Sequence, residues 1–196
     1  MGEGREILEQ IAGGDPIPYV TDPRPEVRRL AAAACAGLGS AAIGPLTRLA
    51  DSDPDQEVRA EAVEVLGRMG VGAFDAVWAT RADPATRVVE STATALGEIG
   101  DARAVPWLAE TLADHPEVIV REAAVAALGA IGDDRALPAI LEAAGAGKPQ
   151  IRRRAVVALT AFEGLEVEQA LMAARLDRNP MVREVAEMVL GRPGPT

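Results

Sequence analysis

The sequence has 196 residues, of which 48% are hydrophobic and only 3% aromatic, and its formal net charge at pH 7 is −10. Nucleic-acid phosphates and anionic membrane surfaces attract an excess of Lys and Arg, so a chain this acidic is a poor general partner for either. One cysteine excludes an internal disulfide, and one histidine excludes a His-rich metal cluster.

The first predicted helix spans residues 3–12, where Ile7, Leu8 and Ile11 recur at helical spacing. Gly13 and Gly14 end this pattern, and two prolines in the next four residues indicate an irregular connector. We therefore expect residues 1–20 to form an N-terminal capping helix followed by a connector.

From residue 21 onward, one pattern recurs six times at a spacing of 30–32 residues. An aliphatic residue opens each copy, Ala or Thr follows four positions later, Leu or Cys eight positions later, and usually a small residue nine positions later. These positions share one face of an α-helix, and a glycine at position twelve can close the helix in a left-handed conformation. The opening residues are Val27, Val58, Val88, Val120, Ile151 and Val182, and the closing glycines are Gly39, Gly70, Gly100 and Gly132.

A shorter second helix is predicted after each of the first five copies, over residues 42–50, 73–81, 104–113, 136–144 and 166–176. Two short amphipathic helices cannot bury both of their apolar faces alone, so the copies must stack. We predict one all-α domain over residues 1–196, with eleven to thirteen helices, no sheet, and Leu128 fully buried. Its parts are repeats 21–51, 52–82, 83–114, 115–145 and 146–177, a C-terminal capping helix over 178–191, and a tail over 192–196.

The loops before the first helices carry a second recurring pattern. Asp-Pro pairs precede three copies, and we predict that each Asp caps a helix whose first turn holds the Pro. His115-Pro116 replaces the pair in the fourth copy, so His115 is interpreted as a polar turn residue. The aspartates are Asp22, Asp53 and Asp83.

An arginine follows the opening aliphatic in five copies, and Val89 replaces it in the third. The row of arginines is either an anion-binding surface or a ladder of Arg–Asp contacts along the stack. The repeat spacing and the nearby acids, which also include Asp177, favour the ladder, interrupted at Val89. The arginines are Arg28, Arg59, Arg121, Arg152 and Arg183.

The pattern V-R-x-x-A-x-x-A-L-G-x-I-G-D-x-R-A-x-P-x-L stands nearly intact at residues 120–140 and in related form at 58–70 and 88–108. It resembles the HEAT-like repeat of the phycobilisome lyase family, and the resemblance covers about residues 21–191. It implies a right-handed α-solenoid of about five HEAT-like helical hairpins with terminal capping helices. The family includes bilin lyase subunits, metal-dependent hydroxylases and adaptors, so this fold does not determine function. The His-Glu iron ligands of the hydroxylases have no histidine counterpart at Arg121-Glu122 or Val89-Glu90.

The candidate site is the outward side of the second helices, which usually line the concave face of such repeats. Trp107 is predicted to be exposed at its centre, whereas Trp78 aligns with a core position. The surface is either a solvated acidic face, a protein-binding site anchored by a tryptophan, or a site for a small cation. The candidate residues are Pro45, Arg48, Asp75, Trp107, Glu110, Thr111, Glu142, Glu168, Gln169 and Met172.

No catalytic, metal or cofactor site emerges from the sequence: it lacks a phosphate-binding loop and a Ser/His/Asp set, and Cys35 falls at a core position. The acidic N-terminus and the absence of an apolar run near the roughly 18 residues of a membrane span favour a cytoplasmic protein. We predict a monomeric, non-catalytic scaffold that binds a basic or amphipathic protein segment on its concave face. The alternatives are an accessory subunit of a bilin lyase-like or other cofactor-attaching enzyme, and a DNA-binding repair protein, which the acidity disfavours.

Overall fold

The computed structural model describes residues 9–11 and 13–191, and among them it contains helices, turns and loops but no strand. The chain divides into two compact units, residues 1–99 and 100–196, which we describe separately. The predicted third repeat, residues 83–114, contributes its first helix to one unit and its second helix to the other.

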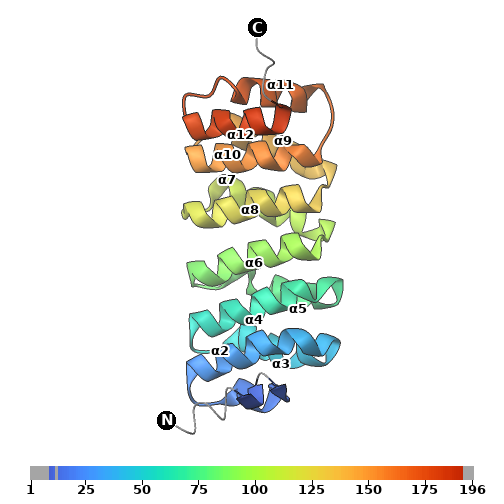
Figure 1. Ribbon diagram of the computed structural model, residues 1–196, viewed down its shortest axis with the longest axis vertical. Coiled ribbons are helices and arrows are strands. Elements are labelled where there is room, and N and C mark those ends of the chain that lie inside the picture. Colours follow the sequence, from blue (N-terminus) through green and yellow to red (C-terminus); the bar gives the residue numbers. More distant parts are fainter. Residues whose placement is uncertain (1–8, 12, 192–196) are drawn as a thin grey trace. The chain divides into compact units, whose positions relative to one another are not determined.

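The first unit is a two-layer stack of helices (Figure 1). One layer holds the first helices of three repeats, α2 (Pro25–Ala34), α4 (Gln56–Arg68) and α6 (Thr86–Ile99). The second layer holds α3 (Ile43–Ser52) and α5 (Phe74–Ala79), which pack on α4 and on each other. Short 3-10 turns precede or connect these helices: η1 (Ile17–Thr21), η2 (Cys35–Ala42), η3 (Gly70–Ala73) and η4 (Thr80–Ala82).

The second unit repeats this arrangement. The helices α8 (Val118–Ile131), α10 (Pro149–Ala158) and α12 (Pro180–Leu190) form one layer. The other layer comprises α7 (Val105–Asp114), α9 (Leu137–Gly145) and α11 (Leu165–Ala174). The short turns are η5 (Ala102–Ala104), η6 (Asp134–Ala136) and η7 (Leu159–Ala161).

These elements confirm the predicted fold class, an all-α solenoid of helical hairpins. The described residues contain eleven α-helices, and each second helix begins within one residue of its predicted start. Of the predicted capping helix at residues 3–12, residues 9–11 are helical and Ile11 is buried, whereas residues 3–8 and 12 lie outside the described residues. The predicted tail, residues 192–196, also lies outside them.

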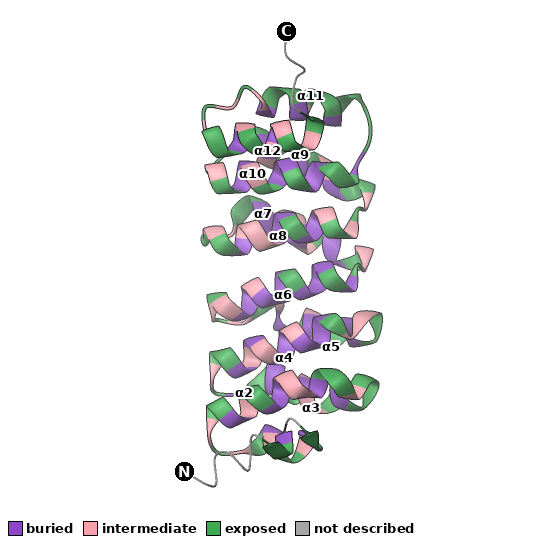
Figure 2. Ribbon diagram, viewed as in Figure 1, coloured by how far each residue is buried: buried purple, intermediate pink, exposed green. Residues whose placement is uncertain are grey.

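The repeated sequence positions form the core. The opening aliphatic and the Ala or Thr four positions later are buried in all six copies. Figure 2 shows buried segments along each of the first helices. Leu128, at position eight, has no exposed surface, which confirms its predicted burial. In the last copy this position holds Leu190, which is 36% exposed because it lies in the final helix of the stack. Cys35 is buried as predicted, and burial raises the pKa of its thiol.

Glycine at position twelve follows the ends of α4, α6 and α8 as predicted, whereas α2 already ends at Ala34 and Gly39 lies within η2. Gly39, Gly70, Gly100 and Gly132 have φ values of 57°, 76°, 73° and 65°, the left-handed region in which a side chain is strained. Gly39 also bends the helical stretch Pro25–Ser52 into a hairpin. This stretch is long and apolar enough by composition to cross a membrane, contrary to the sequence expectation, but it divides into α2 and α3, which both pack on α4.

Glycine at position nine allows neighbouring first helices to approach closely. A Cβ atom on Gly129 would lie 2.7 Å from the Cβ atom of Ala158, and one on Gly67 would lie 2.7 Å from the Cβ atom of Ala95. Both distances are shorter than van der Waals contact, so α8 and α10, like α4 and α6, meet over a surface that has no room for a methyl group.

We therefore expect Gly129→Ala to lower the free energy of unfolding by about 1–3 kcal/mol, because the added methyl group overpacks the contact with Ala158. Urea unfolding followed by circular dichroism measures the loss. Gly145→Ala is the control, since a Cβ atom there meets nothing within 4 Å. Equal unfolding midpoints for wild type and Gly129→Ala would show that α8 and α10 can separate without cost.

Candidate functional site

The outward side of the second helices presents most of the predicted site to solvent. Arg48 on α3, Asp75 on α5, Glu110 on α7 and Glu142 on α9 are exposed, and Pro45 is half-buried. On α11, Glu168 and Gln169 are exposed, and the Met172 side chain is 55% exposed. Asp75 belongs to the first unit, whereas Glu110, Glu142 and Glu168 all belong to the second. The second unit therefore carries three of the four predicted acids on successive helices.

Thr111 is not part of this surface, and its prediction as a contact residue is wrong. It is only 7% exposed, and it lies with Val105, Leu108 and Leu112 on the buried side of α7. The positions three and four residues after Leu108 face the same side of a helix, so both Thr111 and Leu112 turn toward the core.

The two tryptophans occupy less distinct environments than predicted. Trp107 is half-buried, not fully exposed, at the third position of α7. Trp78, predicted in the core, is also half-buried. Its ring stacks on Phe74 at a centroid distance of 5.7 Å, and the Arg81 guanidinium lies 4.6 Å from its ring centroid. Both indoles therefore combine a packed side with an accessible one, as side chains at interfaces do.

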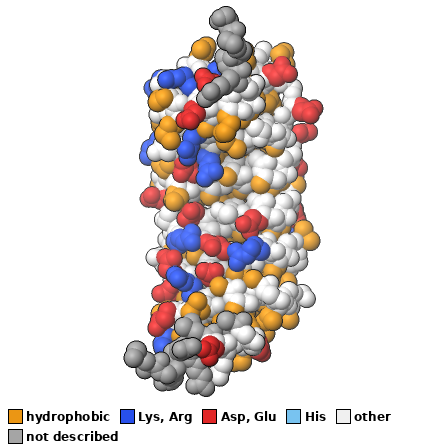
Figure 3. All heavy atoms as spheres, in the orientation of Figure 1, with side chains coloured by type: hydrophobic (Ala, Val, Ile, Leu, Met, Phe, Trp, Pro, Cys, Tyr) orange, Lys and Arg blue, Asp and Glu red, His pale blue; other side chains and the backbone are white. Residues whose placement is uncertain are grey.

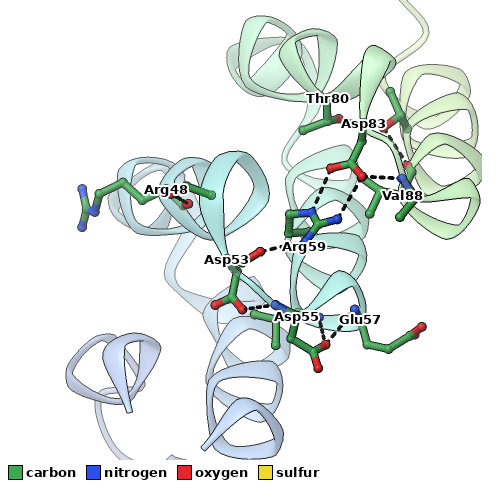
Figure 4. A network of polar contacts seen from close by, with 12 residues as sticks. Arg48, Asp53, Asp55, Glu57, Arg59, Thr80, Asp83 and Val88 are labelled. Carbon is green, nitrogen blue, oxygen red and sulfur yellow. Dashed lines mark hydrogen bonds and ion pairs between the residues drawn. The ribbon is translucent and has the colours of Figure 1, made fainter. Parts of the chain in front are cut away.

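The arginine row forms the predicted ladder in three places. Figure 4 shows one rung, where Arg59 Nε and Nη2 donate to the Asp83 carboxylate at 2.8 and 3.0 Å, and Arg59 Nη1 donates to the Asp53 carbonyl oxygen at 2.8 Å. Arg28 binds the Asp53 carboxylate in the same two-pronged way at 2.7 and 2.8 Å. These hydrogen bonds to the carboxylates raise the pKa values of Arg28 and Arg59, so both guanidinium groups stay charged.

The third rung joins α10 to the loop before α12. Arg152 Nε and Nη2 donate to the Asp177 carboxylate at 2.7 and 2.8 Å, and the two side chains are 4% and 11% exposed. In every rung, the arginine of one copy reaches the aspartate five residues before the opening aliphatic of the next copy. Val89, buried in the third copy, supplies no such group, as predicted. Figure 3 shows charged side chains of both signs gathered toward the left of the view, the side on which Figure 1 places the loops that enter α4 and α6.

The prediction that Asp22, Asp53 and Asp83 cap the first helices is wrong. The N-cap residue of α2 is Arg24, and that of α4 is Asp55, whose carboxylate accepts from the backbone N–H groups of residues 57 and 58. Each Asp before a Pro has extended backbone, as a residue before proline prefers, and its carboxylate accepts the N–H two residues on, at 2.8–2.9 Å. All three aspartates thus order the loop, and the helix begins later. Asp53 and Asp83 also receive the arginine of the preceding copy, whereas the Asp22 carboxylate accepts from the Arg24 side chain.

The same position has other occupants in the fourth and fifth copies. His115 accepts the backbone N–H of Glu117 through Nδ1 at 3.2 Å, which confirms it as a polar turn residue. In the fifth copy the position holds Ala146, which has no side-chain acceptor. In the first copy, Asp22 accepts hydrogen bonds from the Arg24 side chain and backbone, which lower the pKa of Asp22 to about 2.

A hollow between α7 and α9 was not predicted from the sequence. It measures about 200 Å³ and is lined by Arg121, Leu112, Asp114, Glu142 and Ala146 together with small residues of both helices. The signal that would have located it is the alignment of the loops, because Ala146 stands where the ladder requires an aspartate. Glu142 is the one residue of the hollow that belongs to the predicted site.

Comparisons with known proteins agree on the fold. The family model for HEAT repeats matches residues 17–93, 75–160 and 112–191. The complex of CpcE and CpcF of phycocyanin lyase from Nostoc sp. PCC7120 is 23% identical, with a TM-score of 0.69 over 90% of this chain and 74% of that chain. The Escherichia coli protein YibA is 15% identical, with a TM-score of 0.67 over 97% of this chain and 75% of that chain.

A designed armadillo repeat protein in complex with the peptide (KR)4 is also similar: it is 18% identical, with a TM-score of 0.64 over 89% of this chain and 96% of that chain. No curated protein matches the chain. At these identities the structural neighbours establish the architecture, which is a stack of helical hairpins.

Proposed function

The chain belongs to the HEAT repeat family, and from this membership we propose that it is a non-catalytic scaffold for protein interactions. Its proposed ligand is a basic or amphipathic segment of another protein, bound along the outward side of the second helices, the predicted concave face. We also propose that the protein works as a monomer in the cytoplasm. The observation that carries the proposal is the row of exposed acids on successive second helices, beside a half-buried tryptophan.

The acids match the chemistry of a basic ligand. Glu110, Glu142 and Glu168 project from α7, α9 and α11, and neighbouring helices in a stack lie about 8–10 Å apart, so one extended segment can pass all three. The designed armadillo neighbour, which has a similar fold, binds a peptide of alternating Lys and Arg. A surface of this charge would speed the encounter with a cationic segment and disfavour an acidic one.

We expect Trp107→Ala to weaken binding of a labelled (KR)4 peptide by about 2 kcal/mol, because tryptophan is enriched among the residues that dominate binding energy. Fluorescence anisotropy measures the dissociation constant, and circular dichroism checks that the helices remain. Met188→Ala is the matched control, since Met188 is 72% exposed on α12 in the other layer. If both variants bind as wild type does, tryptophan is not the anchor.

Reversing the charge at Glu110 and Glu142 should weaken the same peptide chiefly by slowing association, and added salt should produce the same effect. Stopped-flow fluorescence gives the association rate for the Glu110→Lys/Glu142→Lys double variant. The control is Glu26→Lys/Glu184→Lys, which has the same net charge but places the lysines on the exposed sides of first helices. Equal slowing by both pairs would indicate a non-specific effect of net charge and would remove the second-helix face as the site.

A second candidate function is an accessory subunit of a cofactor-attaching enzyme. It is favoured by the similarity to the complex of CpcE and CpcF, a phycocyanin lyase. The two proposals are distinguished by mixing the protein with a free bilin and recording the visible absorption spectrum. A shifted and intensified band would support the lyase-like role, whereas an unchanged spectrum together with peptide binding would support the scaffold.

A further inference from the structure

The rungs of the Arg–Asp ladder obey a rule from which one arginine departs. The arginine that follows the opening aliphatic of one copy binds the aspartate five residues before the next opening aliphatic. The donor positions hold, in order, Arg28, Arg59, Val89, Arg121, Arg152 and Arg183, and the acceptor positions hold Asp22, Asp53, Asp83, His115, Ala146 and Asp177. The third copy has Val89 at the donor position, and the acceptor position that would pair with it holds His115. Neither an arginine nor an aspartate is therefore left without its ladder partner there. Arg121, however, is retained although its acceptor has become Ala146.

The guanidinium of Arg121 has a different environment from those of the paired arginines. Its Nε donates to the carbonyl oxygen of Leu112 at 2.6 Å, whereas the Nε of Arg28, Arg59 and Arg152 donates to a carboxylate. Within the described chain, this is its one hydrogen bond, and it forms no ion pair. Arg121 is half-buried and lines the hollow, and the N–H groups of its Nη1 and Nη2 are available to donate hydrogen bonds there.

The hollow lies where the missing aspartate would be. Arg121 and Ala146 both line it, and the small side chains of Ala109, Ala113, Ala139 and Ala143 form its walls. Its volume of about 200 Å³ exceeds that of one carboxylate and leaves room for the chain that carries it. The comparable hollow of the first repeat contains both Arg28 and Asp53, so there the protein supplies the carboxylate itself.

We propose that this hollow is a binding site for a carboxylate, supplied by a ligand, that takes the place of the absent aspartate and accepts two N–H groups of Arg121. A planar guanidinium binds a carboxylate in this two-pronged manner. Arg121 would use Nη1 and Nη2, because its Nε donates to the Leu112 carbonyl oxygen, whereas the other rungs use Nε and Nη2. Asp114 and Glu142 also line the hollow, and both are exposed. They repel a bare anion and select a ligand that carries a positive charge beside its carboxylate.

The ligand is thus either a small zwitterion or an acidic residue flanked by basic residues in a peptide. The site goes beyond the proposed scaffold role, since its carboxylate-binding group is Arg121, it does not require Trp107, and it shares only Glu142 with the row of acids on the second helices. The failure of one proposal therefore leaves the other standing.

Titration of the full chain with defined probes tests the site, with the Nε–Hε NMR signal of Arg121 as readout. The probes are acetyl-Lys-Glu-Lys-amide, its Gln counterpart acetyl-Lys-Gln-Lys-amide, and β-alanine, each at constant ionic strength. We expect the Glu peptide to shift the Arg121 signal in a saturable way and the Gln peptide to bind at least tenfold more weakly. If β-alanine saturates the signal with the same affinity as the Glu peptide, the ligand is a small zwitterion. If β-alanine binds with lower affinity, the ligand is a peptide. The absence of saturation with both carboxylate probes, or equal affinity for the Glu and Gln peptides, overturns the proposal.

Substitution at residue 146 provides an independent test. Ala146→Asp should restore the missing rung and raise the unfolding midpoint above that of Ala146→Asn. It should also weaken binding of the Glu peptide at least tenfold, because the new carboxylate of the protein occupies Arg121. Arg121→Gln should lose the peptide to a similar degree, whereas Arg154→Gln, on the exposed side of α10, should retain it. Equal midpoints for the Asp and Asn variants would show that Arg121 cannot engage a carboxylate at this place and would refute the proposal.

Discussion

Replacing Leu128 with alanine is expected to lower the free energy of unfolding by about 2–5 kcal/mol, the usual range for a leucine removed from a packed core. Leu128 has no exposed surface, and its helix, α8, packs on both α7 and α10. Truncation would remove three buried carbons and leave a cavity between helices that are already in contact. The change in urea unfolding, followed by circular dichroism at 222 nm, gives the loss directly.

Ile119 provides the control for this experiment. It lies on the same helix and is 48% exposed, so Ile119→Ala removes a similar apolar side chain from a site that water already reaches. We expect its loss to be below about 1 kcal/mol. A loss of that size for Leu128→Ala as well would mean that the cavity closes when the helices move together, and that the stack is less tightly packed than its burial indicates.

The helices of this protein were predictable because each copy repeats the same physical solution. Val120, Ala124 and Leu128 mark the buried side of a first helix, and a glycine able to adopt positive φ marks its end. Six copies of this pattern average out local irregularities, so even the starts of the short second helices could be placed within one residue. Comparison of the copies indicates the buried side and the start of each helix, which a single amphipathic helix does not define.

The candidate site was predicted less completely because it depends on how the elements pack. Thr111 and Leu112 both follow Leu108 on the core side of α7, and only the packing of α7 on α8 decides that the smaller, polar residue is buried too. The partial burial of Trp107 is likewise determined by how α7 packs on its neighbours. A pattern of apolar and polar residues identifies the buried face of a helix, but the neighbouring helix determines how far the residues at the border of that face are buried.

The loops were the other source of error, for a different reason. An Asp before Pro can cap a helix, order the loop or bind an arginine of another copy, and the local sequence is the same in each case. Asp53 does the last two, since it accepts the N–H of Asp55 at 2.9 Å and two bonds from Arg28. The long-range partner became clear only with the structure, and with it the significance of Ala146.

The second large effect is expected at the ion pair of Arg152 and Asp177. Asp177→Asn should lower the free energy of unfolding at pH 7 by about 3 kcal/mol, because it leaves the Arg152 guanidinium, 4% exposed, without its counter-charge. The asparagine can still accept the N–H of Asn179, which the carboxylate accepts at 2.7 Å, so the loop is preserved. Asp133→Asn is the exposed comparison: its partner, Arg135, is 61% exposed, and water would replace the lost bond with a much smaller change.

The pH dependence of this difference identifies its electrostatic origin. The hydrogen bond from Arg152, together with the N–H of Asn179, lowers the pKa of Asp177 below its ordinary value in the folded state. A carboxyl group with a lowered folded-state pKa stabilises the protein at pH values above its unfolded pKa of about 4, and that stabilisation is lost as the pH falls through the folded-state value. The gap between wild type and Asp177→Asn should therefore be full at pH 7 and shrink progressively below about pH 4. A gap that stays constant over this range would mean that the asparagine disturbs packing, and that the charge of Asp177 contributes little to the stability of the α10–α12 contact.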